Sequence, residues 1–309
     1  MPSSLTESKL PRAAILIVLV LYRQSLRQSR SWITLEKSFA EAPALRGHFD
    51  LLIYDNSPNL SDEDLSGLED SLYVHDQHNS GLAGAYNYAL RLAAERQTPW
   101  LLLLDQDTTL TADYLAEVAA VTSTVLDQPT VAAIVPKLES PKGIKSPTLD
   151  FLDWLRRQFK LNRRPLFVDR DIHGLQHEQF AAFNSGAVLR VSALQAIGGF
   201  PSEFWLDFLD VAVFHALHHA GGRVYILHAC LSHDLSMDST GFYDASGAFD
   251  RHINVLQAMI RFVKRHGTPA DRRLHRFWLL RNAWSQWKNT SDKRFAKASL
   301  YRAMHYHDK

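Results

Sequence analysis

The chain has 309 residues, of which 46% are hydrophobic and 22% charged, an ordinary composition for a globular protein with a large core. Its single cysteine, Cys230, excludes an internal disulfide, and its apolar run at 13–22 is about half the roughly 20 residues that a membrane-spanning helix needs. The net charge of +1 hides an asymmetry: residues 261–309 carry 13 Lys/Arg against 3 Asp/Glu, a balance of +10, so residues 1–260 carry −9. We predict a cytoplasmic protein whose two parts meet different partners.

Residues 1–12 are polar, include two prolines and are predicted to be disordered. From residue 13, strand-like and helix-like stretches alternate: strands at 13–22, 49–54, 72–74 and 101–104, and helices at Trp32 to Phe39 and from Gly81 onward. The second helix has Leu82, Tyr86, Ala89 and Ala93 on one face. Parallel sheets of this kind bind ligands at the carboxyl ends of their strands, where the polar or aromatic residues are Tyr22, Asp55, Asn79 and Asp105.

The strand at 101–104 is followed by two carboxylates, Asp105 and Asp107. Alternate side chains of an extended backbone share a face, so both can converge on one divalent cation and a bound polyphosphate. An acid in an ordinary turn after a buried strand is the other interpretation. The pattern indicates metal-assisted chemistry on a nucleotide.

The second half of the chain continues the α/β pattern. Strands are expected at 131–136, 183–189 and 223–227, and a turn at 198–201 precedes a helix that carries Trp205, Asp207 and Asp210. Residues 140–179, with an amphipathic helix at 151–159, are predicted to be an insertion or a lid over the sheet.

Six motifs occur in an order that resembles the family-2 glycosyltransferases of the GT-A fold, and within them the rhamnosyltransferase-like branch. They are Asp55-Asn56-Ser57, Asn79-Ser80-Gly81 through Asn87, Asp105-Gln106-Asp107, Gly198-Gly199-Phe200, Trp205 through Asp210, and His233. The resemblance covers about residues 13–236 and implies a catalytic domain with a mixed, mostly parallel Rossmann-like sheet flanked by helices. A helical C-terminal extension would then occupy 237–309.

The resemblance implies a donor site at the strand ends. Asp55 would accept the imide N–H of a uracil or thymine and Tyr22 would pack on the base, although Asp55 also suits a turn into Ser57. Asn79 and Gly81 precede a helix whose N-terminus favours a diphosphate, but Asn79 or Ser80 would serve equally as an N-cap.

The same resemblance makes Asn87 a nucleotide contact or a helix-surface amide, and Asp105 a ribose or metal-water contact. It makes Asp107 the ligand of Mg²⁺ or Mn²⁺, which takes oxygen ligands from one or two carboxylates with phosphate and water. His233 would be a further metal or phosphate contact, although a lone histidine after a strand is often structural.

The acceptor side would depend on Asp210 and Asp207. The resemblance implies that Asp210 is the general base that deprotonates the acceptor hydroxyl, with Asp207 supporting it; a capping or ion-paired acid is the alternative. The chain departs from the family pattern at Ala212, at His215-Ala216 and at Leu21-Tyr22-Arg23, which leaves room for an impaired enzyme.

Taken together, the motifs predict an inverting, metal-dependent transferase that moves a sugar such as rhamnose from a TDP, UDP or GDP donor to a bacterial surface polysaccharide or lipid-linked glycan. Alternatives are a non-catalytic partner in glycan assembly and, less favoured, a sugar nucleotidyltransferase, for which only Arg23 and Arg27 lie near the first strand. No zinc site, dinucleotide fingerprint, nucleophile elbow or P-loop is indicated.

The basic C-terminal part contains an aromatic stripe with steps of three or four residues, made of Leu274, Phe277, Leu280, Trp284 and Trp287. Such a helix could lie on an anionic membrane at the inner face of the cell membrane, or pack on the catalytic domain or on a second subunit of a homo-oligomer. Nucleic acid is not expected, because no nucleic-acid-binding fold accompanies the charge.

Overall fold

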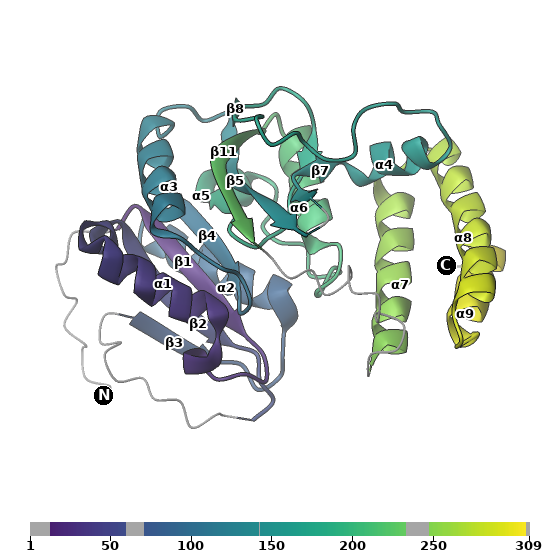
Figure 1. Ribbon diagram of the computed structural model, residues 1–309, viewed down its shortest axis with the longest axis horizontal. Helices are drawn as coiled ribbons and strands as arrows, with labels where there is room; N and C mark the ends of the chain where they lie inside the picture. The colour runs from purple at the N-terminus through teal and green to yellow at the C-terminus, as the bar shows by residue number, and fades with distance from the viewer. Residues whose placement is uncertain (1–12, 60–70, 142, 233–246, 307–309) are drawn as a thin grey trace.

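The computed structural model describes residues 13–59, 71–141, 143–232 and 247–306 (Figure 1). Within them, nine strands form one mixed sheet with the path β3-β2-β1-β4-β10-β5-β11-β8, and β6 pairs with β5. Helices cover both faces of the sheet, and three C-terminal helices stand together at one end of the molecule (Figure 1). The predicted mixed, mostly parallel α/β architecture with a helical extension is confirmed.

The N-terminal half supplies four parallel strands: β1 (Ile15–Leu21), β2 (Phe49–Asp55), β3 (Ser71–His75) and β4 (Trp100–Asp105). All seven residues of β1 are buried, because α1 (Arg30–Glu41) and α3 (Ala112–Thr124) pack on one face and α2 (Gly81–Glu95) on the other. A strand covered on both faces reads as a continuous aliphatic run, which is why the sequence identifies β1 so clearly.

The second half closes the sheet with β5 (Val131–Ser140), β10 (Val188–Arg190), β11 (Arg223–Ser232), β6 (Gly143–Ser146) and β8 (Gly174–Leu175). β10 is shorter than the expected strand at 183–189. The chain turns at Gly186, whose φ of +76° is a left-handed conformation that interrupts a strand. Tyr114 fixes this turn by donating its hydroxyl to the Gly186 carbonyl at 2.6 Å.

Shorter elements complete the domain. They are the 3-10 helices η1 (Leu26–Gln28) and η2 (Pro43–His48), the paired strands β7 (Thr148–Leu149) and β9 (Phe180–Ala181), and the helices α4 (Phe151–Gln158), α5 (Val191–Ala196) and α6 (Leu209–His219).

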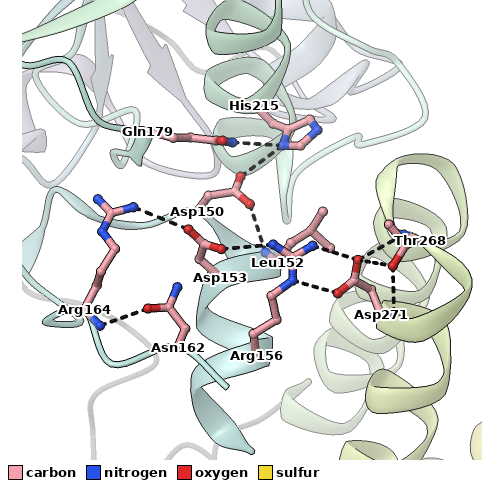
Figure 2. A network of polar contacts seen from close by, with 10 residues as sticks. All are labelled: Asp150, Leu152, Asp153, Arg156, Asn162, Arg164, Gln179, His215, Thr268 and Asp271. Atoms are coloured by element: carbon pink, nitrogen blue, oxygen red, sulfur yellow. Dashed lines mark hydrogen bonds and ion pairs between the residues drawn. The ribbon is translucent and has the colours of Figure 1, made fainter. Parts of the chain in front are cut away.

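Figure 2 shows how α4, in the expected insertion, is tied to two other elements. The Asp150 carboxylate caps α4 by accepting the Leu152 N–H at 2.9 Å, and it contacts His215 of α6 at 3.0 Å. Further along α4, the Arg156 guanidinium donates two hydrogen bonds of 2.9 Å to Asp271 (Figure 2). These contacts attach α4 to α6 and α8.

The C-terminal region consists of α7 (Ala248–His266), α8 (Pro269–Asn289) and α9 (Arg294–Met304). α8 begins with a capping box between Thr268 and Asp271, followed by Pro269 in the first turn, a strong helix start. In the parts of the chain that the structure describes, none of the helices has the length and apolar character needed to cross a membrane.

Candidate active site

The candidate site lies where three parallel strands end side by side. β1 pairs with both β2 and β4, and this register sets Leu21 opposite Asp55 and Val20 opposite Asp105. The strand-end residues predicted from the sequence therefore do share one edge of the sheet.

Asp105 is held rigidly at this edge. Its Oδ1 accepts the Tyr86 hydroxyl of α2 at 3.2 Å, and its Oδ2 accepts the Ser185 hydroxyl at 2.7 Å. Burial raises the pKa of Tyr86 well above its ordinary value, and the negative charges of Asp105, Asp210 and Asp107 add to the shift. Three carboxylates thus lie near one buried phenol.

Asp107 differs from Asp105 in its surroundings, because it is exposed on the loop two residues beyond the strand. One exposed carboxylate beside a partly buried, hydrogen-bonded one is a donor set that suits Mg²⁺ or Mn²⁺, whose remaining ligands are commonly substrate phosphates and water. Within the described residues, no three His, Cys, Asp or Glu side chains form a ready-made metal cage. His233 lies outside the described residues.

Asp210 occupies the first turn of α6 and faces the same acidic group. Its Oδ1 accepts the Val211 N–H at 2.8 Å. Burial raises the pKa of Asp210 to about 6, and the nearby charges of Asp105 and Asp207 push it in the same direction, against the Val211 hydrogen bond. A carboxylate with a pKa near 6 is suited to accept a proton close to neutral pH.

Asp207 and Trp205 lie before α6 and not on it, contrary to the sequence prediction. The reason is Phe208, whose φ of +68° is a left-handed conformation that a right-handed helix cannot include. Asp207 is placed 3.6 Å from the Arg251 Nε of α7. Burial raises the pKa of Asp207, although the Arg251 charge opposes the shift.

Asp55 has no exposed surface. Its Oδ1 accepts the Ser57 N–H at 2.8 Å and its Oδ2 accepts the Tyr73 hydroxyl at 2.8 Å. This is the turn into Ser57 that the sequence offered as the alternative to base binding. Tyr22, by contrast, is 41% exposed beside the Asp105–Asp107 loop, where its backbone N–H donates to Gln106 Oε1 at 2.8 Å.

The loop before α2 is shaped by a residue that the sequence analysis missed. Asp76 accepts the backbone N–H of His78 at 3.0 Å and of Ser80 at 2.8 Å, whereas the Ser80 side chain makes no capping hydrogen bond. An aspartate a few residues before a predicted helix is a turn signal that could have identified it.

Gly81 and Trp205 are in direct contact across the site. Gly81 has φ +74°, and a Cβ atom there would lie 2.4 Å from the Trp205 carbonyl oxygen and 2.5 Å from its indole Cδ1. The indole Nε1 of Trp205 donates to the Asn79 carbonyl at 3.0 Å, while 44% of the side chain is exposed. The donor-side loop and the segment leading to Asp210 are therefore joined by a fixed aromatic side chain.

Asn87, predicted to be a nucleotide contact or a helix-surface amide, bonds to the backbone of Phe200. Its side-chain amide donates to the Phe200 carbonyl at 2.7 Å and accepts the Phe200 N–H at 2.9 Å, so it holds the glycine turn at 198–200 against α2. Ala212 and Ala216, two of the departures from the family pattern, line a separate hollow of about 690 Å³ together with Asn87, Phe200 and Arg91. They do not interrupt the acidic group around Asp105.

Comparison with protein families matches residues 47–196 to "Glycosyl transferase family 2". This range contains Asp55, Asn79, Asp105 and Asp107 and ends before Asp210. A search of curated proteins found no match.

Two solved structures share the fold along most of the chain. S. aureus TarS 1-349 in complex with UDP-GlcNAc has a TM-score of 0.53 and 12% identity, covering 94% of this chain and 81% of that chain. S. aureus TarS 1-349 has a TM-score of 0.51 and 14% identity, covering 94% of this chain and 82% of that chain. At these identities the likeness shows the fold.

Proposed function

Because residues 47–196 form a glycosyl transferase family 2 region, we propose that the protein is an inverting glycosyltransferase that moves a sugar from a nucleoside diphosphate to a glycan or lipid-linked acceptor. The observation that carries the proposal is the group of three acids near Tyr86: Asp105 accepts the Tyr86 hydroxyl at 3.2 Å, and the charges of Asp107 and Asp210 also act on Tyr86. A nucleotide-sugar transferase needs a cation to neutralise the departing diphosphate and a base for the acceptor. Asp105 and Asp107 would hold the cation, and Asp210 would be the base.

In the proposed reaction, Asp210 accepts the proton of the acceptor hydroxyl as its oxygen bonds to the anomeric carbon. The bond from that carbon to the diphosphate breaks in the same step, so the configuration at the carbon inverts. The charge of Asp207 adds to the raised pKa of Asp210, and in the proposed reaction Asp207 supports this base or holds the acceptor. General-base assistance of this kind contributes about 10²–10⁴ in rate.

The donor would bind at the edge formed by β1, β2 and β4. The exposed ring of Tyr22 is available to stack on a base, while Asp55 supports this wall from within through Ser57 and Tyr73. A bound Mg²⁺ or Mn²⁺, held by Asp107 with Asp105 next to it, would neutralise charge on the leaving diphosphate. Gly81 and the N-terminus of α2 would face the same anion.

A UDP sugar is the first donor to try, because the TarS fold relative was solved with UDP-GlcNAc. TDP and GDP sugars follow, since the motif pattern also resembles rhamnosyltransferases. The expected acceptor class is a bacterial surface polysaccharide or its lipid-linked precursor.

The decisive experiment measures the thermal unfolding midpoint with UDP, TDP, GDP and CDP, each with and without Mn²⁺. One diphosphate should stabilise the protein in a Mn²⁺-dependent way, and Asp107→Ala should abolish that shift, because a ligand that binds only the folded state raises its stability. Asp127→Ala removes an exposed carboxylate elsewhere and serves as the control.

A second readout separates transfer from mere binding. Asp210→Asn should keep the diphosphate-dependent shift and lose Mn²⁺-dependent hydrolysis of the matching nucleotide sugar. No shift with any diphosphate would contradict the donor site. A shift without hydrolysis in the wild-type protein would identify a non-catalytic binder.

A further inference from the structure

The outward face of α8 is apolar and aromatic, although the helix is already packed on its other side. Phe277, Leu280, Trp284 and Trp287 are 61%, 37%, 63% and 50% exposed, and steps of three and four residues place them in one stripe. We call these four residues the α8 stripe. Contiguous exposed apolar side chains of this size indicate an interaction site more often than chance.

The fold itself does not need the α8 stripe. The inward face of α8 is a separate set of buried residues that includes His275, Leu279 and Ala283. Trp278 packs edge-on against Trp154 of α4 with ring centroids 5.5 Å apart. Leu274, which the sequence grouped with the stripe, joins the core. Packing on the rest of the chain, one of the two alternatives to a membrane, therefore leaves much of the surface of the four stripe residues uncovered.

The charge around the stripe has one sign. Its exposed neighbours on α8 are the basic residues Arg272, Arg273, Arg276, Arg281 and Lys288. The only acid of the helix is Asp271, which is 1% exposed and bonded to Arg156. The Lys288 ammonium lies 4.7 Å from the Trp284 ring centroid, so cation and aromatic are interleaved.

We propose that α8 docks on an anionic lipid surface. Tryptophan prefers the boundary between headgroups and acyl chains, and basic residues at the same level attract anionic headgroups. A symmetric contact with a second copy would bring the five cations of each α8 together, and the one acid of α8, Asp271, is buried, so the contact would be unfavourable. The anionic headgroups of a lipid surface would pair with the basic residues of α8, and its headgroup boundary would bury the aromatic rings of the stripe.

The test is co-sedimentation of the full chain with vesicles of phosphatidylcholine alone and with added phosphatidylglycerol. Binding should require the anionic lipid and weaken as salt is raised. The pair Trp284→Ser and Trp287→Ser should lower the affinity at least about tenfold, because the apolar contribution to interfacial binding scales with the buried area.

Two further variants locate the effect. Arg273→Glu with Lys288→Glu should also weaken binding to anionic vesicles, by an amount that shrinks at high salt. Tyr301→Ser with Met304→Ser removes exposed side chains of α9, 58% and 56% exposed, and should leave the affinity within about twofold if α8 carries the contact. Circular dichroism and the thermal unfolding midpoint verify that each variant is folded.

Three outcomes would overturn the proposal. The first is wild-type protein that binds neither vesicle, and the second is equal loss of binding in the α8 and α9 variants. The third is a dimer in light scattering that the tryptophan substitutions dissociate without any vesicle binding, which would assign the stripe to a second copy. None of these results depends on the transferase activity, so the two proposals can fail separately.

Discussion

Asp210, the proposed base, illustrates how the neighbours of one residue can raise its pKa. An isolated aspartate is too weakly basic near pH 7, but burial and the charges of Asp105 and Asp207 raise the pKa of Asp210 to about 6. The active form is the carboxylate, so activity is present above this pKa and is lost as the pH falls through it.

We therefore expect kcat/KM for sugar transfer or donor hydrolysis to fall below about pH 6. Asp207→Asn removes a negative charge beside the base and should move this limb to lower pH, whereas Asp210→Asn should lower kcat about 10²–10⁴-fold. Asp127→Asn is the control for a remote exposed acid. If the pH profile of Asp207→Asn falls at the same pH as that of the wild type, the charge of Asp207 does not raise the pKa of Asp210.

The strand-end acids could be predicted because β1, β2 and β4 are continuous apolar runs that end abruptly in polar residues. The hydrogen-bond partners of Asp105 could not be predicted from the sequence. Tyr86 has the spacing of a core residue on α2, and Ser185 belongs to a turn whose place beside β4 follows from the antiparallel insertion of β10. Contacts between residues about 20 and 80 positions apart depend on topology, which local patterns do not encode.

At the level of elements, α4 connects the α/β domain to the C-terminal helices: Asp150 before it contacts α6, and Arg156 within it bonds to α8. Burial alone would raise the pKa of Asp271, but hydrogen bonds from Arg156 and Thr268 outweigh it and hold the pKa below its usual value. The stabilisation from this group is therefore present above the ordinary aspartate pKa and is lost as the pH falls toward the lowered one.

Asp271→Ala should lower the free energy of unfolding by about 3 kcal/mol near pH 7, because it removes two hydrogen bonds of Arg156 and the Asp271 half of the capping box of α8. Arg156 would keep its ion pair with Asp153. The difference from wild type should shrink in acid. Urea unfolding measures both, and Asp292→Ala, at an exposed ion pair, should change the free energy of unfolding far less than Asp271→Ala does. Equal effects in the two variants would show that the contact between Arg156 and Asp271 does not stabilise the fold.

The start of α6 is an element boundary that the local sequence pattern does not predict. The sequence extended the acidic helix back to Trp205, but the left-handed Phe208 starts α6 only at Leu209. Non-glycine residues seldom adopt that conformation, so nothing in the composition announces it. The buried face of α2, by comparison, follows directly from its periodicity.

On the scale of the whole molecule, the C-terminal helices share a core with the catalytic domain. Phe262 of α7 lies 5.8 Å from Phe151 of α4 and 6.1 Å from Phe208, measured between ring centroids. The same buried cluster reaches β1 and α2 on one face of the sheet. The helical extension is thus continuous with the packing beneath the acidic site.

Phe262→Ala should lower the free energy of unfolding by about 3–5 kcal/mol, since it empties a fully buried aromatic position. Phe277→Ala, at an exposed phenylalanine of α8, should change it by less than about 0.5 kcal/mol. Urea unfolding followed by circular dichroism compares the two. A small loss in Phe262→Ala would show that α7 is only loosely attached.

The contact between Gly81 and Trp205 also limits how this protein can change through evolution. A side chain at position 81 would occupy the space that the indole fills, and a smaller residue at position 205 would release the Asn79 carbonyl and open a gap. Neither position can vary alone without cost, so the two should be inherited as a pair. The loop before α2 and the segment before α6 would then diverge together.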